Sequence, residues 1–196
     1  MPKSAKSIAE LGLTIGVAVV LALLIQAFVV KPYRIPSGSM LPTLAIGQRV
    51  LTNRLIAHPS VGDIVVFHPP SGADPQPAVC GGPSSQQQAC DLPTPAESST
   101  TFIKRVVAGP GDRISIIGGH VIRNGVREKD PYIKPCGGVS GCDLPKPIVV
   151  PPGDYFMMGD NRGDSDDSRF WGPVPDKWII GVAFFTYWPP DRVGLL

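Results

Sequence analysis

Charged side chains are scarce in this sequence, and histidine and cysteine are scarcer still. Only 17% of the 196 residues are charged and the formal net charge is +2, so the chain lacks the strong field typical of nucleic-acid-binding proteins. Three histidines and four cysteines offer few metal ligands, and the cysteine spacings do not resemble the C-x-x-C pairs of zinc sites. The acidic segment that begins at Asp164 lacks the glycine and glutamate of a calcium-binding loop. We therefore expect neither nucleic acid nor a metal ion as a partner.

Glycine and proline, in contrast, are abundant, with 22 and 23 residues. Their combined share is roughly twice the average for globular proteins, which argues against a helix bundle. Turn signals such as Asn124-Gly125 and Pro152-Gly153 separate short apolar or alternating runs. These runs predict strands at 49–53, 63–67, 102–108, 113–117, 120–123, 154–158 and 178–187. The predicted fold class is mainly β, with antiparallel sheets.

Residues 11–30 form an uncharged run in which Gln26 is the only strongly polar side chain. A helix of this length spans about 30 Å, the thickness of the hydrocarbon core of a bilayer, so the run predicts a transmembrane helix. A removable signal peptide is the alternative, because two lysines precede the run. The run is longer than the usual apolar part of a signal peptide, and no Ala-x-Ala-like site follows Ala27. We therefore expect a retained anchor preceded by a cytoplasmic tail at 1–10.

The cysteines indicate the compartment of the rest of the chain. Basic residues flank both ends of the apolar run, so the positive-inside rule only slightly favours a cytoplasmic N-terminus. Nine residues separate Cys80 from Cys90, and five separate Cys136 from Cys142, in loop-like sequence. Two local pairs are typical of loop-closing disulfides, which persist in an oxidising compartment. Free thiols in a cytosolic domain are the alternative, and we expect the disulfides and an extracytoplasmic domain.

The remaining residues, 31–196, are enough for one domain with a substantial hydrophobic core. Two stretches near 69–101 and 130–152 are rich in proline and glycine and lack the strand pattern. We expect them to be surface excursions, each closed by one cysteine pair. The sequence contains no internal repeat.

A short segment just after the apolar run is a candidate nucleophile site. Residues 35–43 read Ile-Pro-Ser-Gly-Ser-Met-Leu-Pro-Thr and place Ser37 and Ser39 on either side of Gly38. The prolines fix the backbone at both ends, and the glycine permits a ligand to approach closely. A rigid, exposed serine suits a nucleophile, and a polar linker is the alternative interpretation.

A serine hydroxyl needs a base to become a good nucleophile. None of the three histidines has a sequence context that marks it as that base. Lys104 and Arg105 lie inside an apolar strand pattern, and the period-two alternation does not choose between them. Lysine loses its proton when it is buried, whereas arginine does not. Lys104 is therefore the candidate base, with an ordinary surface lysine as the alternative.

A third candidate segment, residues 159–169, reads Gly-Asp-Asn-Arg-Gly-Asp-Ser-Asp-Asp-Ser-Arg. We expect a loop whose side chains hydrogen-bond one another and hold nearby groups in place. Its expected parts are an Asp167–Arg169 pair and a free hydroxyl at Ser165. A solvated acidic turn is the alternative.

Four segments in this order resemble the successive sequence boxes of bacterial type I signal peptidases: 37–43, 62–67, 104–112 and 159–172. The apolar run just upstream and the β-rich remainder match as well, so the resemblance covers most of residues 11–196. Each segment alone is weakly specific, but four in order are specific. The excursion that holds the first cysteine pair is not a general feature of that family.

The resemblance implies a serine endopeptidase with a Ser-Lys dyad and no cofactor. Ser39 would attack the scissile carbonyl, neutral Lys104 would accept its proton, and an acyl-enzyme would form and be hydrolysed. The Ser39 N–H and the Ser37 hydroxyl would bind the oxyanion. The residues that match the supporting positions of the family are Ser165, which would orient the lysine amine, and the bracing pair Asp167 and Arg169.

The substrates implied by the resemblance are signal peptides of exported preproteins, cut after small-x-small sequences such as Ala-x-Ala. Shallow apolar pockets would reject larger side chains. Candidates to line them are residues close to the dyad in sequence: Tyr33, Ile35, Met40, Leu44, Phe102 and Ile103. We expect a monomeric, single-pass protein of the bacterial cell membrane whose partners are signal peptides and the lipid bilayer.

Three other functions remain as alternatives. A penicillin-binding type of acyltransferase needs S-x-x-K, but the third residue after Ser37 is Met40 and the third after Ser39 is Pro42. A self-cleaving repressor-type protease shares the dyad chemistry but needs no transmembrane segment. An anchored β domain that only binds a partner would tolerate replacement of Lys104.

Overall fold

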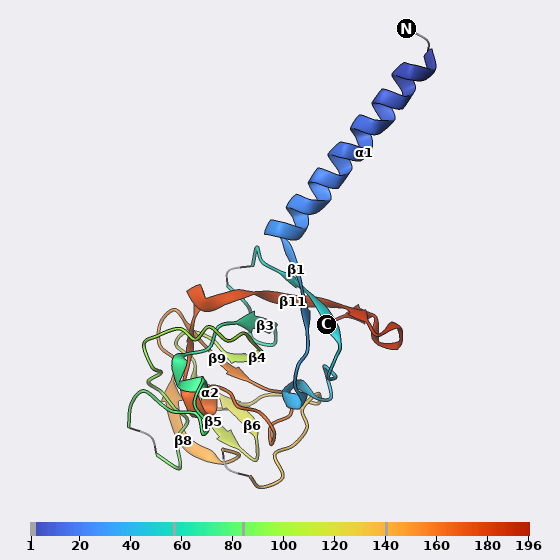
Figure 1. Cartoon of the computed structure of the whole chain (residues 1–196). Helices are drawn as coiled ribbons and strands as arrows, with labels where there is room; N and C mark the ends of the chain where they lie inside the picture. Colours follow the sequence, from blue (N-terminus) through green and yellow to red (C-terminus); the bar gives the residue numbers. More distant parts are fainter. Residues whose placement is uncertain (1–2, 57, 84, 140) are drawn as a thin grey trace.

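Antiparallel strands make up most of the chain after an N-terminal helix (Figure 1). The structure is a computed structural model that describes residues 3–56, 58–83, 85–139 and 141–196. The helices are α1 (Lys3–Phe28) and α2 (Ser168–Trp171), with 3-10 turns η1 (Gly38–Met40), η2 (Ser71–Ala73), η3 (Asp176–Trp178) and η4 (Pro190–Arg192). The strands are β1 (Val30–Arg34), β2 (Arg49–Asn53), β3 (Ile64–Phe67), β4 (Phe102–Ala108), β5 (Arg113–Ile117), β6 (His120–Arg123), β7 (Val126–Arg127), β8 (Leu144–Val149), β9 (Asp154–Met158), β10 (Val174–Pro175), β11 (Ile179–Trp188) and β12 (Gly194–Leu195).

The strands form two sheets within the described part of the chain. The larger has the order β1-β2-β11-β3-β4-β9-β10, with β12 paired to β11, and the smaller has the order β7-β6-β5-β8. All of these pairings are antiparallel, so the predicted mainly β fold is confirmed. The smaller sheet lies at the end of the domain away from α1 (Figure 1). This arrangement places β4 inside the larger sheet, between β3 and β9.

The sequence pattern located most strands closely. β2, β4, β5, β6 and β9 have the predicted bounds, and β3 and β11 differ from prediction by one residue at their ends. The predicted turn at Asn124-Gly125 has positive φ at both residues (53° and 82°), as a tight hairpin turn requires. The main difference is β8, which lies inside the expected excursion 130–152. Two prolines hide its pattern, and they are tolerated because β8 is an edge strand of its sheet.

Three apolar clusters fill the interior. One lies between the smaller sheet and β9, and a second surrounds Trp171. The third joins Met40 and Leu44 to residues of β2, β3 and β11. Burying a side chain of this size contributes about 1.5–3 kcal/mol, so the third cluster fixes the chain around η1 to the larger sheet.

Helix α1 projects away from the β domain (Figure 1), and its apolar side chains are exposed, as at Leu13 (70%). It ends at Phe28, two residues before the predicted end of the membrane segment, and β1 begins at Val30. Within the described ranges, no helix combines the length and the apolarity needed to span a membrane. The transmembrane segment therefore stays a prediction. Residues 1 and 2 of the predicted cytoplasmic tail lie outside the described residues.

Both predicted cysteine pairs are joined as disulfides, Cys80–Cys90 with an S–S distance of 2.03 Å and Cys136–Cys142 with 2.16 Å. The excursion 69–101 folds back onto the domain. Its base is closed by the Ser98 N–H, which donates to Pro69 O at 2.8 Å. The Cys90 N–H donates to the carbonyl of Arg169 in α2 at 3.0 Å. The first disulfide thus closes a loop that packs against the segment after β9.

Candidate active site

Ser39 lies in the middle of the short turn η1, which the third apolar cluster holds in place. Ser37 is extended (φ −137°, ψ 167°), and the Leu41 N–H donates to Gly38 O at 3.1 Å to close the turn. The next side chain, Met40, is fully buried, so the turn cannot rotate without opening the core. Ser39 is consequently held in one position and is 7% exposed.

Lys104 reaches Ser39 from β4. Its Nζ donates a hydrogen bond to Ser39 Oγ at 2.6 Å, although 65 positions separate the two residues. The lysine lies opposite Val65 of β3, is 5% exposed, and has its Nζ 5.6 Å from the centre of the Phe102 ring. The pairing of β3 with β4 and the position of η1 together bring the candidate nucleophile and the candidate base into contact.

Burial lowers the pKa of Lys104 from 10.5 to about 8, because the ammonium loses its hydration. The nearby carboxylates of Asp167, Asp166 and Asp164 raise this pKa and so limit the shift. With a pKa of about 8, roughly a tenth of the lysines are neutral at pH 7. A neutral amine that touches a serine hydroxyl can act as a general base.

Ser37 lies beside this pair. Its Oγ is 3.3 Å from Ser39 Oγ, and both serines line the same cavity. The hydroxyl is thus near the place where a tetrahedral oxyanion would form on an acylated Ser39. Its role as an oxyanion donor stays a prediction.

A cavity of about 510 Å³ opens next to Ser39 and Lys104. This volume is within the range of pockets that bind ligands or short peptide segments. Four of the six predicted substrate-binding residues line it, namely Tyr33, Ile35, Phe102 and Ile103. The other two, Met40 and Leu44, are fully buried in the third apolar cluster and do not line the cavity. Closeness in sequence did not distinguish the side of η1 that faces the core from the side that faces the cavity.

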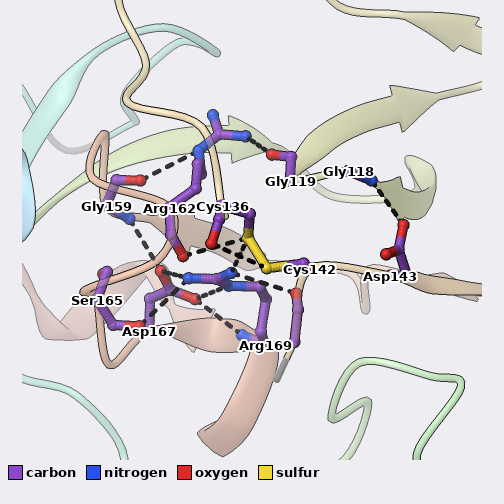
Figure 2. Close-up of a disulfide and its surroundings, with 11 residues drawn as sticks. Gly118, Gly119, Cys136, Cys142, Asp143, Gly159, Arg162, Ser165, Asp167 and Arg169 are labelled. Atoms are coloured by element: carbon purple, nitrogen blue, oxygen red, sulfur yellow. Dashed lines mark hydrogen bonds and ion pairs between the residues drawn. A yellow bond between two sulfur atoms is a disulfide. The ribbon is translucent and has the colours of Figure 1, made fainter. Parts of the chain in front are cut away.

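Asp167 and Arg169 form a buried ion pair (Figure 2). Arg169 Nε donates to Asp167 Oδ1 at 2.7 Å and Nη2 donates to Oδ2 at 2.9 Å. Burial alone would raise the pKa of Asp167, but the guanidinium holds it below its ordinary value. The same carboxylate accepts the Gly159 N–H at 3.0 Å. The pair therefore fixes the backbone just after β9.

Ser165 lies in this loop, and its carbonyl accepts a hydrogen bond from Arg169 Nη2 at 3.2 Å. Its hydroxyl is buried and has no hydrogen-bond partner among the described residues. The structure therefore shows no bond from Ser165 to Lys104, and the orienting role of Ser165 stays a prediction. The hydroxyl lies against Gly159, where a Cβ would collide with it.

Asn161, for which the sequence pattern predicted no role, holds η1 in place. Its side-chain Nδ2 donates to Gly38 O at 3.1 Å, and its N–H donates to Ser39 O at 3.0 Å. The neighbouring Asp160 accepts two hydrogen bonds from Arg105, at 2.8 and 2.7 Å. It also accepts one from the Thr43 hydroxyl at 2.5 Å. These residues were part of the segments that carried the family resemblance, but only the structure shows what they contact.

Arg162 connects the same segment to the smaller sheet (Figure 2). Its side chain donates to the carbonyls of Gly159, at 3.1 Å, and Gly119. Burial lowers the pKa of this guanidinium. The 159–169 segment is thus an internal brace that links both sheets to the dyad, rather than a solvated acidic turn.

The order of these parts along the chain agrees with a known peptidase family. A family model described as "Signal peptidase, peptidase S26" matches residues 8–188. The chain belongs to this signal peptidase family. The predicted resemblance is therefore confirmed, and the protein is a peptidase.

Relatives within the signal peptidase family cover nearly the whole chain. "Probable signal peptidase I-1" of Synechocystis sp. is 42% identical, over 92% of this chain and 82% of its own length. "Signal peptidase I" of Leptolyngbya laminosa is 38% identical, over 100% and 87%. "Signal peptidase IB" of Staphylococcus aureus (strain COL) is 30% identical, over 94% and 91%. A crystal structure of a signal peptidase I from Enterococcus faecalis matches with a TM-score of 0.40 and 21% identity, over 64% of this chain and 96% of its own.

We expect removal of the two disulfides to affect this signal peptidase differently. Arg169 Nη1 donates to Gly141 O at 3.2 Å, inside the loop that Cys136–Cys142 closes. Removing either disulfide should lower the free energy of unfolding by about 2–3 kcal/mol, because both loops are short. Only the Cys136→Ser/Cys142→Ser variant should also lose activity, by roughly tenfold, because it loosens the Asp167–Arg169 pair of the 159–169 brace.

Denaturant unfolding and peptide cleavage of the two double variants, side by side, check this expectation. Cys80→Ser/Cys90→Ser is the matched control, since that pair contacts Arg169 only through the Cys90 backbone N–H, which serine keeps, and not through the guanidinium. An equal loss of activity in both variants would contradict the assignment of Arg169 as a link between the second disulfide and the dyad.

Proposed function

We propose that this peptidase removes N-terminal signal peptides from exported preproteins, with Ser39 as nucleophile and Lys104 as general base. The observation that carries the proposal is the 2.6 Å contact between Lys104 Nζ and Ser39 Oγ. The amine is buried, and the contact lies at the wall of a peptide-sized cavity. The names of the relatives support the substrate class.

In the first proposed step, Ser39 Oγ attacks the carbonyl carbon of the scissile bond while Lys104 Nζ accepts the hydroxyl proton. The distance allows this transfer without a bridging water. The new ammonium then protonates the leaving amine, the C–N bond breaks, and the signal peptide remains as an ester on Ser39. Neutral Lys104 next deprotonates a water molecule, which attacks the ester carbonyl. The bond to Ser39 Oγ then breaks, the signal peptide leaves as a carboxylic acid, and Lys104 returns the proton to Ser39 Oγ.

Two donors are proposed to stabilise the oxyanion formed in each step, namely the Ser39 N–H and the Ser37 hydroxyl. The position of Ser37 Oγ, 3.3 Å from the nucleophile, supports its part. Removing one such donor in a serine protease typically lowers kcat by about 100-fold or more.

The apolar part of the cavity is proposed to set the preference for small-x-small sequences. Tyr33 and Ile35 approach it from the segment before η1, and Phe102 and Ile103 approach from β4. Both walls are fixed by sheet pairing, so a larger substrate side chain would have to displace packed strands. Rejection of one extra methylene is worth about 1–3 kcal/mol in such pockets.

Helix α1 is proposed to anchor the enzyme in the lipid bilayer, with 1–10 in the cytoplasm and 31–196 outside it. The exposed apolar side chains of α1 support the anchor, and the two disulfides support an oxidising compartment for the domain. Anchoring would confine enzyme and membrane-inserted substrate to one surface and so raise their effective concentration. The protein is proposed to act as a monomer in the bacterial cell membrane.

The proposed base predicts a distinct pH dependence. Because only neutral Lys104 can accept the serine proton, kcat/KM should rise with pH and level off above an apparent pKa of about 8. Cleavage of a short peptide, measured from pH 6 to pH 10, checks this. A profile that is flat, or that falls through this range, would contradict a lysine base.

The proposal is tested by cleavage of a preprotein by detergent-solubilised protein, with the position of the cut located by mass. Ser39→Ala should abolish cleavage, whereas Ser60→Ala, at an exposed serine away from the cavity, should cleave like the wild type. Cleavage that persists in Ser39→Ala, in a preparation free of host peptidase, would exclude the proposed mechanism.

A further inference from the structure

The cavity wall contains two carboxylates that the proposed cleavage step does not use. Asp164 and Asp166 both line the cavity, and neither forms a salt bridge within the described residues. We refer to these two carboxylates as the acidic pair. Their nearest neighbours show how each is held.

Asp166 is held by the excursion 69–101. Gln76, which also lines the cavity, donates its Nε2–H to Asp166 Oδ2 at 3.3 Å. Thr100 and Thr101, from the other end of the excursion, line the cavity as well. The excursion therefore forms a wall of the substrate cavity and supplies a neutral partner to the carboxylate.

Asp164 lies close to the nucleophile turn. Its Oδ2 accepts a hydrogen bond from Asn161 Nδ2 at 3.4 Å, and a Cβ placed on Gly38 would lie 3.6 Å from that oxygen. Gly38 directly precedes Ser39. A substrate bound for attack by Ser39 would therefore pass within a few ångströms of this carboxylate.

The charge of the acidic pair is not balanced by Lys104 in the form of the enzyme that begins the reaction. Lys104 lines the cavity too, but it must be neutral to accept the serine proton. Arg34, an exposed cation that also lines the cavity, pairs with neither aspartate. Asp166 Oδ1 is buried and has no hydrogen-bond partner among the described residues, and burial raises the pKa of this carboxyl. A positively charged substrate group would supply the missing counter-charge.

We propose that Asp164 and Asp166 form a subsite that selects preproteins with a basic side chain close to the cleavage point. This inference rests on the proposed function and deepens it, because it assigns a further specificity to the same cavity. The excursion would act in this selection by holding Asp166 in the wall. A free cation on the substrate gains by pairing with a carboxylate that has only a neutral partner.

The test compares matched peptides that carry either arginine or citrulline, its uncharged analogue, at each position that flanks the cut. Assays at pH 9.5 keep Lys104 mainly neutral while arginine stays charged. In at least one position, wild-type kcat/KM should be roughly three- to tenfold higher for arginine at low ionic strength. The gain should appear in KM rather than in kcat, and it should shrink in about 1 M salt.

Single variants Asp164→Asn and Asp166→Asn should bring the arginine-to-citrulline ratio toward one. Asp91→Asn is the matched control, because Asp91 is an exposed aspartate of the excursion 69–101 and does not line the cavity. This variant should keep the wild-type ratio. Each ratio is taken within one variant, so a general loss of activity cancels. If a variant fails to fold, the salt dependence of the wild-type ratio still decides.

A wild-type ratio of one at every position would overturn the inference, as would a ratio that neither substitution nor salt changes. These outcomes leave the proposed function intact, since citrulline peptides would still be cut in a Ser39-dependent manner. Failure of the wild type to cut any of the peptides would instead count against the proposed function.

Discussion

The Lys104→Met variant should lose at least about 10⁴-fold in kcat/KM while remaining folded, as expected when one member of a catalytic unit is removed. Methionine has a similar length and can fill the buried space that the lysine side chain occupies beside Ser39. It cannot accept the proton of Ser39 Oγ, which lies 2.6 Å from the lysine amine in the native protein. Cleavage of a preprotein, measured with circular dichroism on the same sample, checks both parts.

The same substitution should increase stability at neutral pH. A native pKa of about 8, against 10.5, means that burial of the charged amine costs about 3 kcal/mol. Below pH 8 the lysine is protonated in both the native and the unfolded state, so the wild type carries this full penalty. Between pH 8 and 10.5 only the unfolded state holds the proton, so wild-type stability rises with pH. The advantage of Lys104→Met should thus be largest near pH 6–7 and disappear by about pH 10.5.

Denaturant unfolding at a series of pH values measures this advantage. Lys129→Met, at an exposed lysine, is the control and should show no comparable gain. A Lys104→Met variant that is less stable than the wild type at pH 6 would mean that the lysine is not buried as a cation. A variant that retains cleavage would exclude Lys104 as the base.

The second large effect is expected at Gly159. A Cβ at this position would collide with the Ser165 hydroxyl and with the carbonyl oxygen of Ser39. Gly159→Ala must therefore displace the backbone of Ser39 relative to the segment after β9, and a displacement of about 1 Å in reacting groups costs roughly 100-fold in rate. Overpacking should also lower the free energy of unfolding by about 1–3 kcal/mol.

Cleavage rate and denaturant unfolding of Gly159→Ala test this prediction together. Gly153→Ala is unsuitable as a control because its φ is 80°, whereas Gly109 has ordinary backbone geometry and room for a Cβ. Gly109→Ala should therefore retain most of the activity. Wild-type activity in Gly159→Ala would show that the nucleophile turn does not depend on this contact.

The sequence was sufficient to predict β4, which carries Lys104, and the neighbouring β9, because both are short runs rich in apolar residues and bounded by turn signals. It also predicted both disulfides, since each pair is local. β1 was missed because its residues, Val-Lys-Pro-Tyr-Arg, do not alternate and follow directly on an apolar run. β8 was missed because of its prolines.

The residue types of the candidate site were predictable from the sequence, but the directions in which its side chains point were not. Chemistry favoured Lys104 over Arg105 as a base, and the structure shows the consequence of alternation: Lys104 contacts Ser39 whereas Arg105 binds Asp160. Which side of η1 faces the core depends on contacts with β2, β3 and β11, which are distant in sequence. For the same reason the part of the excursion 69–101 in the cavity wall could not be foreseen, because it depends on one amide that meets a carboxylate 90 positions away.

The linker between α1 and β1 is too short to be flexible. Val29 alone separates the helix from the strand, and its carbonyl accepts a hydrogen bond from the Arg54 N–H at 2.9 Å. Ser39 follows the end of β1 by only five residues. If α1 is embedded in lipid as proposed, the height of the nucleophile above the membrane surface is set by the rigid sheet and not by a flexible tether. A flexible Gly-Ser spacer added after Phe28 should therefore produce cuts at several positions in membrane-inserted preproteins. Cleavage of free peptides should be unaffected.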